Sequence, residues 1–596
     1  MKAKTILFLF ISITLLSSCL EKNKEKVLNI YSRQKIQNIE PAKASTVYEE
    51  RVSRQIFETL YEYSYLGDQD ELIPLIAEAL PKISKDGLTY TIKIKPEIKF
   101  IDDTCFKSTK GKGRSVKAQD VIYSLKYFAA SPPFKRSFFM YYIDGLIDFR
   151  KNAKLAYKKG IDRVTFIKRN EVSGLKLEDE NTVSIKLVQP CPYFIETMIQ
   201  PGASIIPIEA LEYYGDKFNE HPVGTGPFML DSLNKNGKTI LVKNKNYVHT
   251  KYPTRGSEEE VNRGFLKDAN LQLPLIDKIV IKNISTDRER EIAFNKGEID
   301  LYSPEQESFY DYFPNDNHLS KASLDLGVGV EQVNNSKFSG LLLNMKDPLI
   351  AKNKFLRKAI IHSFDNAKNI SVFFYEKPIT AYWIIPPNVF GYDSNYRNPC
   401  AYNIEEAKKD LAKAGYPNGK GLEELVLLLE RTPLMGRVGK FFAESASKVG
   451  INVKLEFVDQ LEDVKKIISE GNRKIHIFAV SEYSLFSTPE ALLRMFYKGK
   501  LKYKTNYSSY YNLEYENLYE KVALINKGPE KLKLLNRMRD IVIEDHVVIP
   551  LSFSLLYRLH YDYVKNYKPH VMMFDRYKYV NIDTEQKKQI IKKLPK

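Results

Sequence analysis

Short runs in which hydrophobic and polar residues alternate recur along this chain, separated by stretches with the period of an amphipathic helix. Residues 27–31 (VLNIY) and 88–94 (LTYTIKI) place apolar side chains at every second position, as a half-buried strand does. Residues 47–61 carry their apolar side chains at helical spacing instead. The same patterns predict strands at 182–187, 239–243, 276–281, 340–344, 425–429, 451–457, 475–480 and 548–553, and helices at 118–128, 287–295, 353–364, 404–414, 438–449 and 532–545.

The order of these elements indicates an α/β protein. Strand, helix and strand follow one another between residues 425 and 457, which is a βαβ unit. A chain of 596 residues is too long for one ordinary domain, so we expect two to four. Neither an internal repeat nor a low-complexity linker is evident. We therefore expect lobes that are joined by several crossing strands.

The N-terminus has the pattern of an export signal. Lys2 and Lys4 precede an apolar run over 6–16, which is too short for a confident membrane span. The sequence Leu-Ser-Ser-Cys that ends at Cys19 resembles the bacterial lipobox, in which the cysteine is lipidated and cleavage occurs before it. We predict a signal peptide at 1–18, lipidation of Cys19 and a polar tether over 19–26; an ordinary signal peptide with a chance cysteine is the alternative.

Charge and cysteine content exclude some classes of partner. Lysine and arginine number 91 against 74 acidic residues, a net charge of +17 that is spread along the chain. This falls short of a nucleic-acid footprint, although a basic surface favours anionic ligands and lipid headgroups. Cys105, Cys191 and Cys400 lack the spacing of a zinc site, so no metal is predicted, and one disulfide among them stays open.

The sequence lacks complete catalytic motifs. None of the eight histidines forms HExxH, and no GxSxG occurs. The glycine-rich stretch at 415–421 has the wrong spacing for a phosphate loop and follows a helix. SxxK occurs at Ser32 and Ser445, but the partner motifs of a penicillin-binding enzyme are absent. We therefore predict a binding protein without a cofactor, and not an enzyme.

Several short motifs occur in order between Asn29 and Leu551. They are QIFETLYEYS with Glu58 and Leu60; Ala77-Glu78, Asp86-Gly87 and Phe100; VKAQDVIYS with Asp120; PVGTGPF over 222–228 with Lys243–Tyr247; FNKGEID with Gly297 and Asp300; Leu343-Asn344 with Arg357 and Ala359; and Tyr402 to Tyr416 around Ala407 and Gly415. Together they resemble the family 5 extracellular solute-binding proteins, which are the peptide-binding, nickel-binding and related receptors of ABC importers.

The resemblance implies a two-lobed periplasmic-binding-protein type II fold, with a hinge between the lobes and a small domain inserted in the first. It assigns the chain to lobe I (27–60, 181–283 and 546–596), the inserted domain (61–180) and lobe II (284–545). The ligand of this family lies between the lobes, which close by bending at the hinge. Peptide receptors of the family hold their ligand extended, backbone to backbone.

One departure from the family affects the expected site. Peptide binders commonly carry an Asp that pairs with the free amine of the peptide, within a stretch that matches 481–489 here. Leu485 stands at the Asp position, so either Glu482 or Glu49 supplies the charge or the ligand has no free amine there. Glu49 is otherwise a helix N-terminal carboxylate on a solvated face. The expected ligand-binding residues are Glu49, Glu482, Tyr483, Ser484, Leu485 and Phe486.

The resemblance implies a function in uptake. The chain is expected to be the monomeric, lipid-anchored substrate-binding component of an ABC importer, exported to the cell membrane or the periplasm side. Its partners would be peptides or a similar polar solute and the permease and ATPase subunits. The alternative is a surface lipoprotein of the same fold that acts as an adhesin, a chaperone or a sensor, because the anchor stretch at 481–489 is altered.

Overall fold

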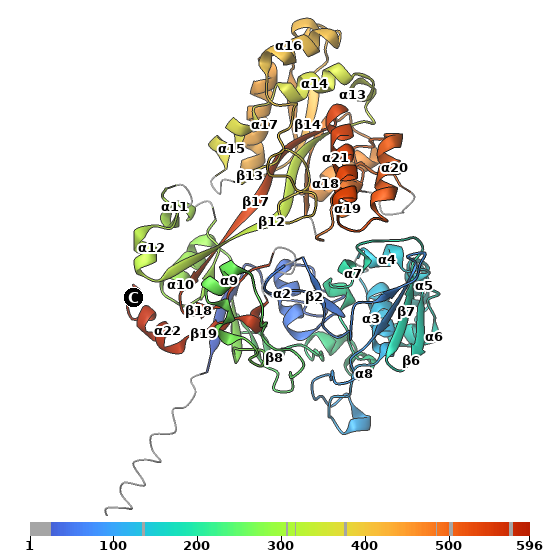
Figure 1. The fold of residues 1–596 in the computed structure, drawn as a ribbon, viewed down its shortest axis with the longest axis vertical. Coiled ribbons are helices and arrows are strands. Elements are labelled where there is room, and N and C mark those ends of the chain that lie inside the picture. The colour runs from blue at the N-terminus through green and yellow to red at the C-terminus, as the bar shows by residue number, and fades with distance from the viewer. Residues whose placement is uncertain are drawn as a thin grey trace, which may run out of the picture.

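Two lobes lie one above the other in Figure 1. The computed structural model describes residues 25–68, 70–133, 137–305, 308–315, 318–374, 378–483, 486–499, 505–570 and 576–595. The first lobe, below in the figure, contains two four-stranded sheets, and the second lobe is built on a seven-stranded sheet. Strands and helices are mixed in both lobes, which confirms the α/β prediction.

The first sheet of the first lobe gathers strands that are far apart in sequence. Its order is β1 (Val27–Ser32), β10 (Lys278–Asn283), β9 (Lys238–Lys243) and β8 (Phe228–Lys235). β1 pairs with β10 in parallel, and the two others follow as antiparallel neighbours. The three predicted strands at 27–31, 239–243 and 276–281 are therefore confirmed.

A second, smaller sheet lies at the other end of the first lobe. Its order is β4 (Lys82–Ile83), β5 (Thr89–Lys93), β7 (Thr182–Lys186) and β6 (Leu175–Asp179). Alternate residues of β5 and β7 are buried beneath α3, as the alternating sequence predicts. The helices of this region are α3 (Ala118–Ala130), α4 (Phe139–Tyr142), α5 (Leu146–Lys158), α6 (Arg163–Arg169), α7 (Phe194–Thr197) and α8 (Ile208–Tyr214).

The predicted βαβ unit forms part of the sheet of the second lobe. β14 (Leu425–Glu430) and β15 (Val453–Val458) run parallel, joined by α17 (Pro433–Ser447), and α18 (Leu461–Glu470) leads on to β16 (Ile477–Tyr483). The odd-numbered leucines of β14 share a core with α17, while Leu428 shares one with α18. Coverage of both faces explains why LVLLLE is apolar without alternation.

Two strands of the second lobe are much longer than the sequence predicted. The expected strands at 340–344 and 548–553 are the ends of β12 (Val328–Leu343) and β17 (Val548–Tyr561). The two pair antiparallel along nearly their whole length and run from the first lobe up into the second in Figure 1. Their pairing shifts register between Asn334 and Phe338, where a bulge bends the ladder.

Further helices cover the second lobe. α14 (Lys354–His362) and α16 (Ile404–Lys413) lie against each other, and α20 (Leu513–Val522) contacts α21 (Pro529–Glu544). α14, α16 and α21 confirm the helices predicted at 353–364, 404–414 and 532–545, with ends that differ by a few residues, whereas α20 was not predicted. The shorter elements are α13 (Pro348–Lys352), α15 (Asn366–Phe373), β13 (Ile379–Thr380), α19 (Glu490–Leu493), β11 (Leu301–Tyr302), α11 (Phe309–Tyr312) and α12 (Lys321–Asp325).

The first helix ends earlier than its sequence pattern indicates. α2 (Val47–Ile56) stops because Phe57 adopts an extended backbone, and β2 (Tyr61–Tyr63) begins where the pattern was still helical. The loop PVGTGPF closes on this end: a Cβ on Gly224 would lie 2.1 Å from the carbonyl oxygen of Ile56. Close backbone approach explains the glycine there.

Cys105, Cys191 and Cys400 are free thiols. The disulfide that the sequence left open does not form among the described residues.

Asp300, from the FNKGEID motif, ties three distant segments together. Its buried carboxylate accepts hydrogen bonds from the backbone N–H of Asn29 at 2.6 Å and from the Tyr563 hydroxyl at 2.7 Å. It also pairs with the Lys587 ammonium at 2.8 Å, on α22 (Thr584–Ile591). The motif residue therefore joins β1 to the C-terminal part of the chain.

Asp300→Ala is expected to lower the free energy of unfolding by about 3–5 kcal/mol, because it leaves the Lys587 ammonium without its buried partner. Urea denaturation followed by circular dichroism measures the change. Glu298→Ala is the matched control from the same motif, since its exposed pair with Lys282 contributes at most about 1 kcal/mol. Equal losses in both variants would contradict the assignment.

Candidate functional site

A cavity of about 610 Å³ opens in the second lobe at the carboxyl ends of its parallel strands. The last residues of β14 and β16 form one side, and the first turns of α17 and α18 form another. Ligands of open α/β sheets bind beyond the carboxyl ends of the strands, where loops and helix N-termini converge. The lining includes Lys337, Ser339, Glu430, Thr432, Arg437, Glu462, Lys465, Ser481, Glu482, Tyr483, Ser552 and Ser554.

One edge of β16 faces this cavity without a partner strand. β12 pairs with all of β16 on one side, from Ile477 to Tyr483. On the other side β14 pairs only at Ile477 and Phe478. From residue 479 to 483, no strand among the described residues covers that second edge. An uncovered strand edge presents backbone donors and acceptors to whatever enters the cavity.

Glu482 and Tyr483, two of the residues predicted to bind the ligand, both line the cavity. The Glu482 carboxylate pairs with the Lys465 ammonium at 2.7 Å, and both side chains are partly exposed. Burial acts to lower the pKa of Lys465, but the Glu482 carboxylate outweighs it and the pKa is raised. Tyr483 is 53% exposed, with the Lys337 ammonium 5.6 Å from its ring centroid.

Glu49 lies in the first lobe, in the first turn of α2, and its side chain does not face this cavity. It is buried, and its two oxygens accept hydrogen bonds from the backbone N–H groups of Gln37, Asn38, Ser45 and Thr46 and from the Ser45 hydroxyl. Burial would raise the pKa of Glu49, but the backbone bonds from Ser45, Asn38 and Gln37 outweigh it and lower the pKa. The carboxylate therefore fixes the loop before α2.

The other predicted residues of this stretch do not line the cavity or are not described. Phe486 is fully buried against the first lobe, where its ring stacks on Tyr193 with 5.4 Å between centroids. Ser484 and Leu485 lie outside the described residues, as does Cys19. The structure thus brings Glu482 and Tyr483 together and puts Glu49 and Phe486 elsewhere.

Glu196 joins the two lobes, although no sequence pattern marks it. This residue of α7 is buried, and its Oε2 accepts a hydrogen bond from the backbone N–H of Ser487 at 2.6 Å. The Tyr63 hydroxyl donates to the same oxygen. Burial raises the pKa of Glu196. No motif marks the residue, because its importance comes only from the contact between lobes.

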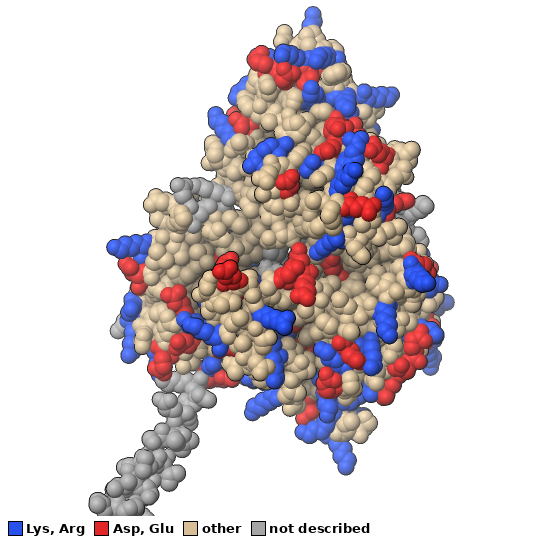
Figure 2. Space-filling model, viewed as in Figure 1, with Lys and Arg blue, Asp and Glu red and all other residues tan. Residues whose placement is uncertain are grey.

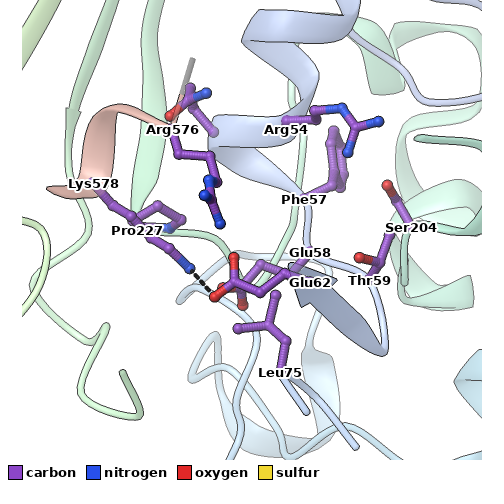
Figure 3. A pocket seen from close by; sticks show the side chains of 11 residues that line it. Arg54, Phe57, Glu58, Thr59, Glu62, Leu75, Ser204, Pro227, Arg576 and Lys578 are labelled. Carbon is purple, nitrogen blue, oxygen red and sulfur yellow. Dashed lines mark hydrogen bonds and ion pairs between the residues drawn. The ribbon is translucent and has the colours of Figure 1, made fainter. Parts of the chain in front are cut away.

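A second cavity, of about 50 Å³, lies inside the first lobe beside the end of α2 (Figure 3). Its carboxylates already have partners within the protein. Glu62 pairs with the Lys578 ammonium at 3.0 Å, drawn as a dashed line, and Glu58 accepts hydrogen bonds from Tyr247 and from Thr225 of the PVGTGPF loop. Burial would raise the pKa of Glu58, but His249 and Lys578 outweigh it and lower the pKa.

Three other features were sought among the described residues: a basic patch, a metal cluster and a membrane-spanning helix. Figure 2 shows Lys and Arg interleaved with Asp and Glu over the visible face, without a patch of positive charge alone. Among the described residues, no His, Cys, Asp and Glu side chains gather in a group able to hold a metal ion. In the same part of the chain, no helix has the length and apolar character needed to cross a membrane.

Known proteins resemble this chain over most of its length. The model of bacterial extracellular solute-binding proteins, family 5 Middle, matches residues 71–503. Glutathione-binding protein GsiB of Escherichia coli is 24% identical over 559 residues, which are 92% of this chain and 93% of that protein.

Solved structures agree with that match. DppA from Helicobacter pylori, in complex with the peptide STSA, is similar with a TM-score of 0.65 and 22% identity, over 95% of this chain and 100% of that one. HbpA2 from Haemophilus parasuis gives a TM-score of 0.71 and 20% identity, over 94% and 99%. The expected two-lobed periplasmic-binding-protein type II fold is confirmed. The chain belongs to the bacterial extracellular solute-binding proteins of family 5.

Proposed function

We propose that this protein is the lipid-anchored substrate-binding component of an ABC importer. It captures a peptide or a similar polar solute between its two lobes and delivers it to a membrane permease with its ATPase subunits. Membership of the solute-binding family supports a role in binding rather than in catalysis. The protein acts as a monomer, exported to the membrane or the periplasm side and held there through Cys19.

The uncovered edge of β16 is the observation that carries this proposal. Residues 479–483 line the cavity of about 610 Å³ and have a partner strand on one side only. An extended peptide that lies along this edge gains backbone hydrogen bonds that do not depend on its side chains. The roomy cavity then receives side chains of different shapes, and a weak preference for sequence follows.

The names of similar proteins are consistent with a short peptide as the ligand. One relative is a glutathione-binding protein, and one similar structure holds the peptide STSA. Peptides carry backbone amides and charged ends, and the cavity offers serine hydroxyls with both acidic and basic side chains. A zwitterionic or polar solute fits such a lining better than an apolar one.

Within this site we propose that Glu482 and Tyr483 contact the ligand. Glu482 is the acid that lines the cavity on β16 itself, so it is the one to meet an ammonium group. Glu49 supports the wall of the first lobe, since backbone donors occupy its oxygens. Phe486 packs against the first lobe outside the cavity lining, and Ser484 and Leu485 stay predicted contacts.

The domain division also remains a proposal: lobe I from 27–60, 181–283 and 546–596, an inserted domain at 61–180, and lobe II at 284–545. The second four-stranded sheet supports an inserted domain, although its strand β7 (Thr182–Lys186) lies just beyond residue 180.

Cys19→Ser is expected to abolish lipidation and leave the body folded, because residue 19 precedes β1 and the tether separates the two. The protein is expressed in its own host, and its partition between detergent and aqueous phases then measures whether the lipid anchor is present. Circular dichroism checks the fold. A variant that still enters the detergent phase like the wild type would show that the lipobox assignment is wrong.

Glu482→Gln is expected to weaken binding of a free-amine peptide by about 10- to 100-fold, because a charge-assisted hydrogen bond in a cleft is worth about 1.5–3 kcal/mol. The measurement is calorimetric titration with a pool of tetrapeptides and with the same pool after N-acetylation. Acetylation removes the ammonium, so the two proteins should bind the acetylated pool with similar affinity.

Glu456→Gln is the matched control, because Glu456 forms a comparable pair with Lys454 on β15 outside the cavity. Its affinity for both pools should equal that of the wild type. If Glu482→Gln leaves binding of the free-amine pool unchanged, Glu482 does not hold an amine. If the wild type binds neither pool, the ligand is not a peptide.

A further inference from the structure

A segment of the second lobe, residues 486–494, lies against the first lobe directly after the cleft strand β16. Phe486 is fully buried there, stacked on Tyr193 and edge-on to Phe138 at 5.1 Å between centroids. Tyr193 and Phe138 immediately precede α7 and α4 of the first lobe. The ring of Phe486 is thus enclosed by the opposite lobe, and separation of the lobes exposes it to water.

A polar contact accompanies this aromatic one. The backbone N–H of Ser487 donates to Glu196 Oε2 at 2.6 Å and lies 3.4 Å from the Tyr63 hydroxyl, which bonds the same carboxylate. All three residues are buried. The direction of the N–H bond fixes how the lobes meet, which an apolar contact alone does not.

The segment is held firmly on its own lobe. Glu490 and Lys531 form an ion pair between α19 and α21, with both side chains almost fully buried. From α20, the Tyr519 hydroxyl donates to the Glu490 carbonyl at 3.1 Å and the Tyr515 hydroxyl to the Leu493 carbonyl at 2.8 Å. The segment therefore moves with the second lobe as one body.

We propose that Phe486, Ser487 and Glu196 form a latch that closes the two lobes in the absence of ligand and so sets the affinity for it. The proposal rests on the proposed function, in which ligand binds between the lobes. Phe486 stands three residues after Tyr483, so the ligand surface and the latch belong to one stretch of chain. Ligand binding and the latch both favour the form in which the lobes are together. A residue that increases the population of this form raises the ligand affinity by the same factor as the population.

The test begins with closure in the absence of ligand. The full chain is unfolded in guanidinium chloride, refolded to remove bound solute and measured by small-angle X-ray scattering. The wild type should match this structure, in which Phe486 and Ser487 contact the first lobe, and Phe486→Ala should give a larger radius of gyration. Tyr483→Ala is the matched control. Tyr483 lies in the same stretch but is 53% exposed, so the loss of its ring should not change the scattering of the ligand-free protein.

The second arm measures binding of the tetrapeptide pool by calorimetry. Phe486→Ala should bind about 10-fold more weakly and release the pool faster, because the binding-competent closed form is less populated. Glu196→Ala removes the acceptor of the Ser487 N–H and should open the lobes as well, whereas Glu196→Gln keeps an acceptor and should keep them closed. If Phe486→Ala does not fold, the two Glu196 variants test the latch in its place.

The latch is overturned if the ligand-free wild type is already as open as these variants, or if Phe486→Ala and Glu196→Ala stay closed. Scattering requires no ligand, so the latch and the proposed function fail separately. Opening in Phe486→Ala with no binding of peptides by the wild type would support the latch and refute peptide capture. If the wild type binds peptides and neither variant changes the scattering or the affinity, peptide capture would be supported and the latch refuted.

Discussion

The pairing of β12 with β17 is the interaction on which the rest of the molecule depends. These two strands pair with each other and pass together from one lobe to the other, so the paired ribbon connects the lobes. The upper part of β12 supports β16 and, through it, the whole βαβ unit. The bulge between Asn334 and Phe338 interrupts the ladder, and Ser336 there has a φ of 51°. A regular ladder would be stiff; an irregular one gives the lobes a place to bend.

The buried acids of the first lobe described above are satisfied within the protein, and this has consequences for binding. The acids of the small cavity in the first lobe hold Lys578, Tyr247 and Thr225, and Glu49 holds a loop. The larger cavity differs, since its pair of Glu482 and Lys465 is partly exposed to solvent. A partly hydrated pair exchanges partners at little cost, whereas a buried one does not. In the proposed function, recognition of a charged solute therefore falls to the second lobe.

The seam between the lobes combines two kinds of contact with different physical roles. Burial of Phe486 between Tyr193 and Phe138 favours closure without regard to direction. The bond from the Ser487 N–H to Glu196 adds direction, although a buried carboxylate also carries a desolvation cost that shows in its raised pKa. Aromatic burial thus supplies the affinity between lobes, and the hydrogen bond supplies their alignment.

Local patterns in the sequence determined most secondary structure and the family. Alternation in VLNIY and LTYTIKI and the apolar run LVLLLE mark strands because their period follows from burial of one or both faces. Motif residues such as Asp300 and Gly224 have fixed partners, so their presence in order was enough to indicate the fold.

Tertiary structure alone decided the length of β12 and β17, the end of α2 at Ile56 and the site itself. Residues 331–334 show no strand pattern in the sequence, and their pairing with β17 holds them extended. Glu49 and Glu482 are both glutamates in plausible positions, yet one is occupied by backbone donors and the other lines a cavity. Glu196 lies 291 residues from its partner Ser487, and no periodicity links them. Local burial is written in the spacing of a sequence, whereas a contact between distant segments exists only after the chain has folded.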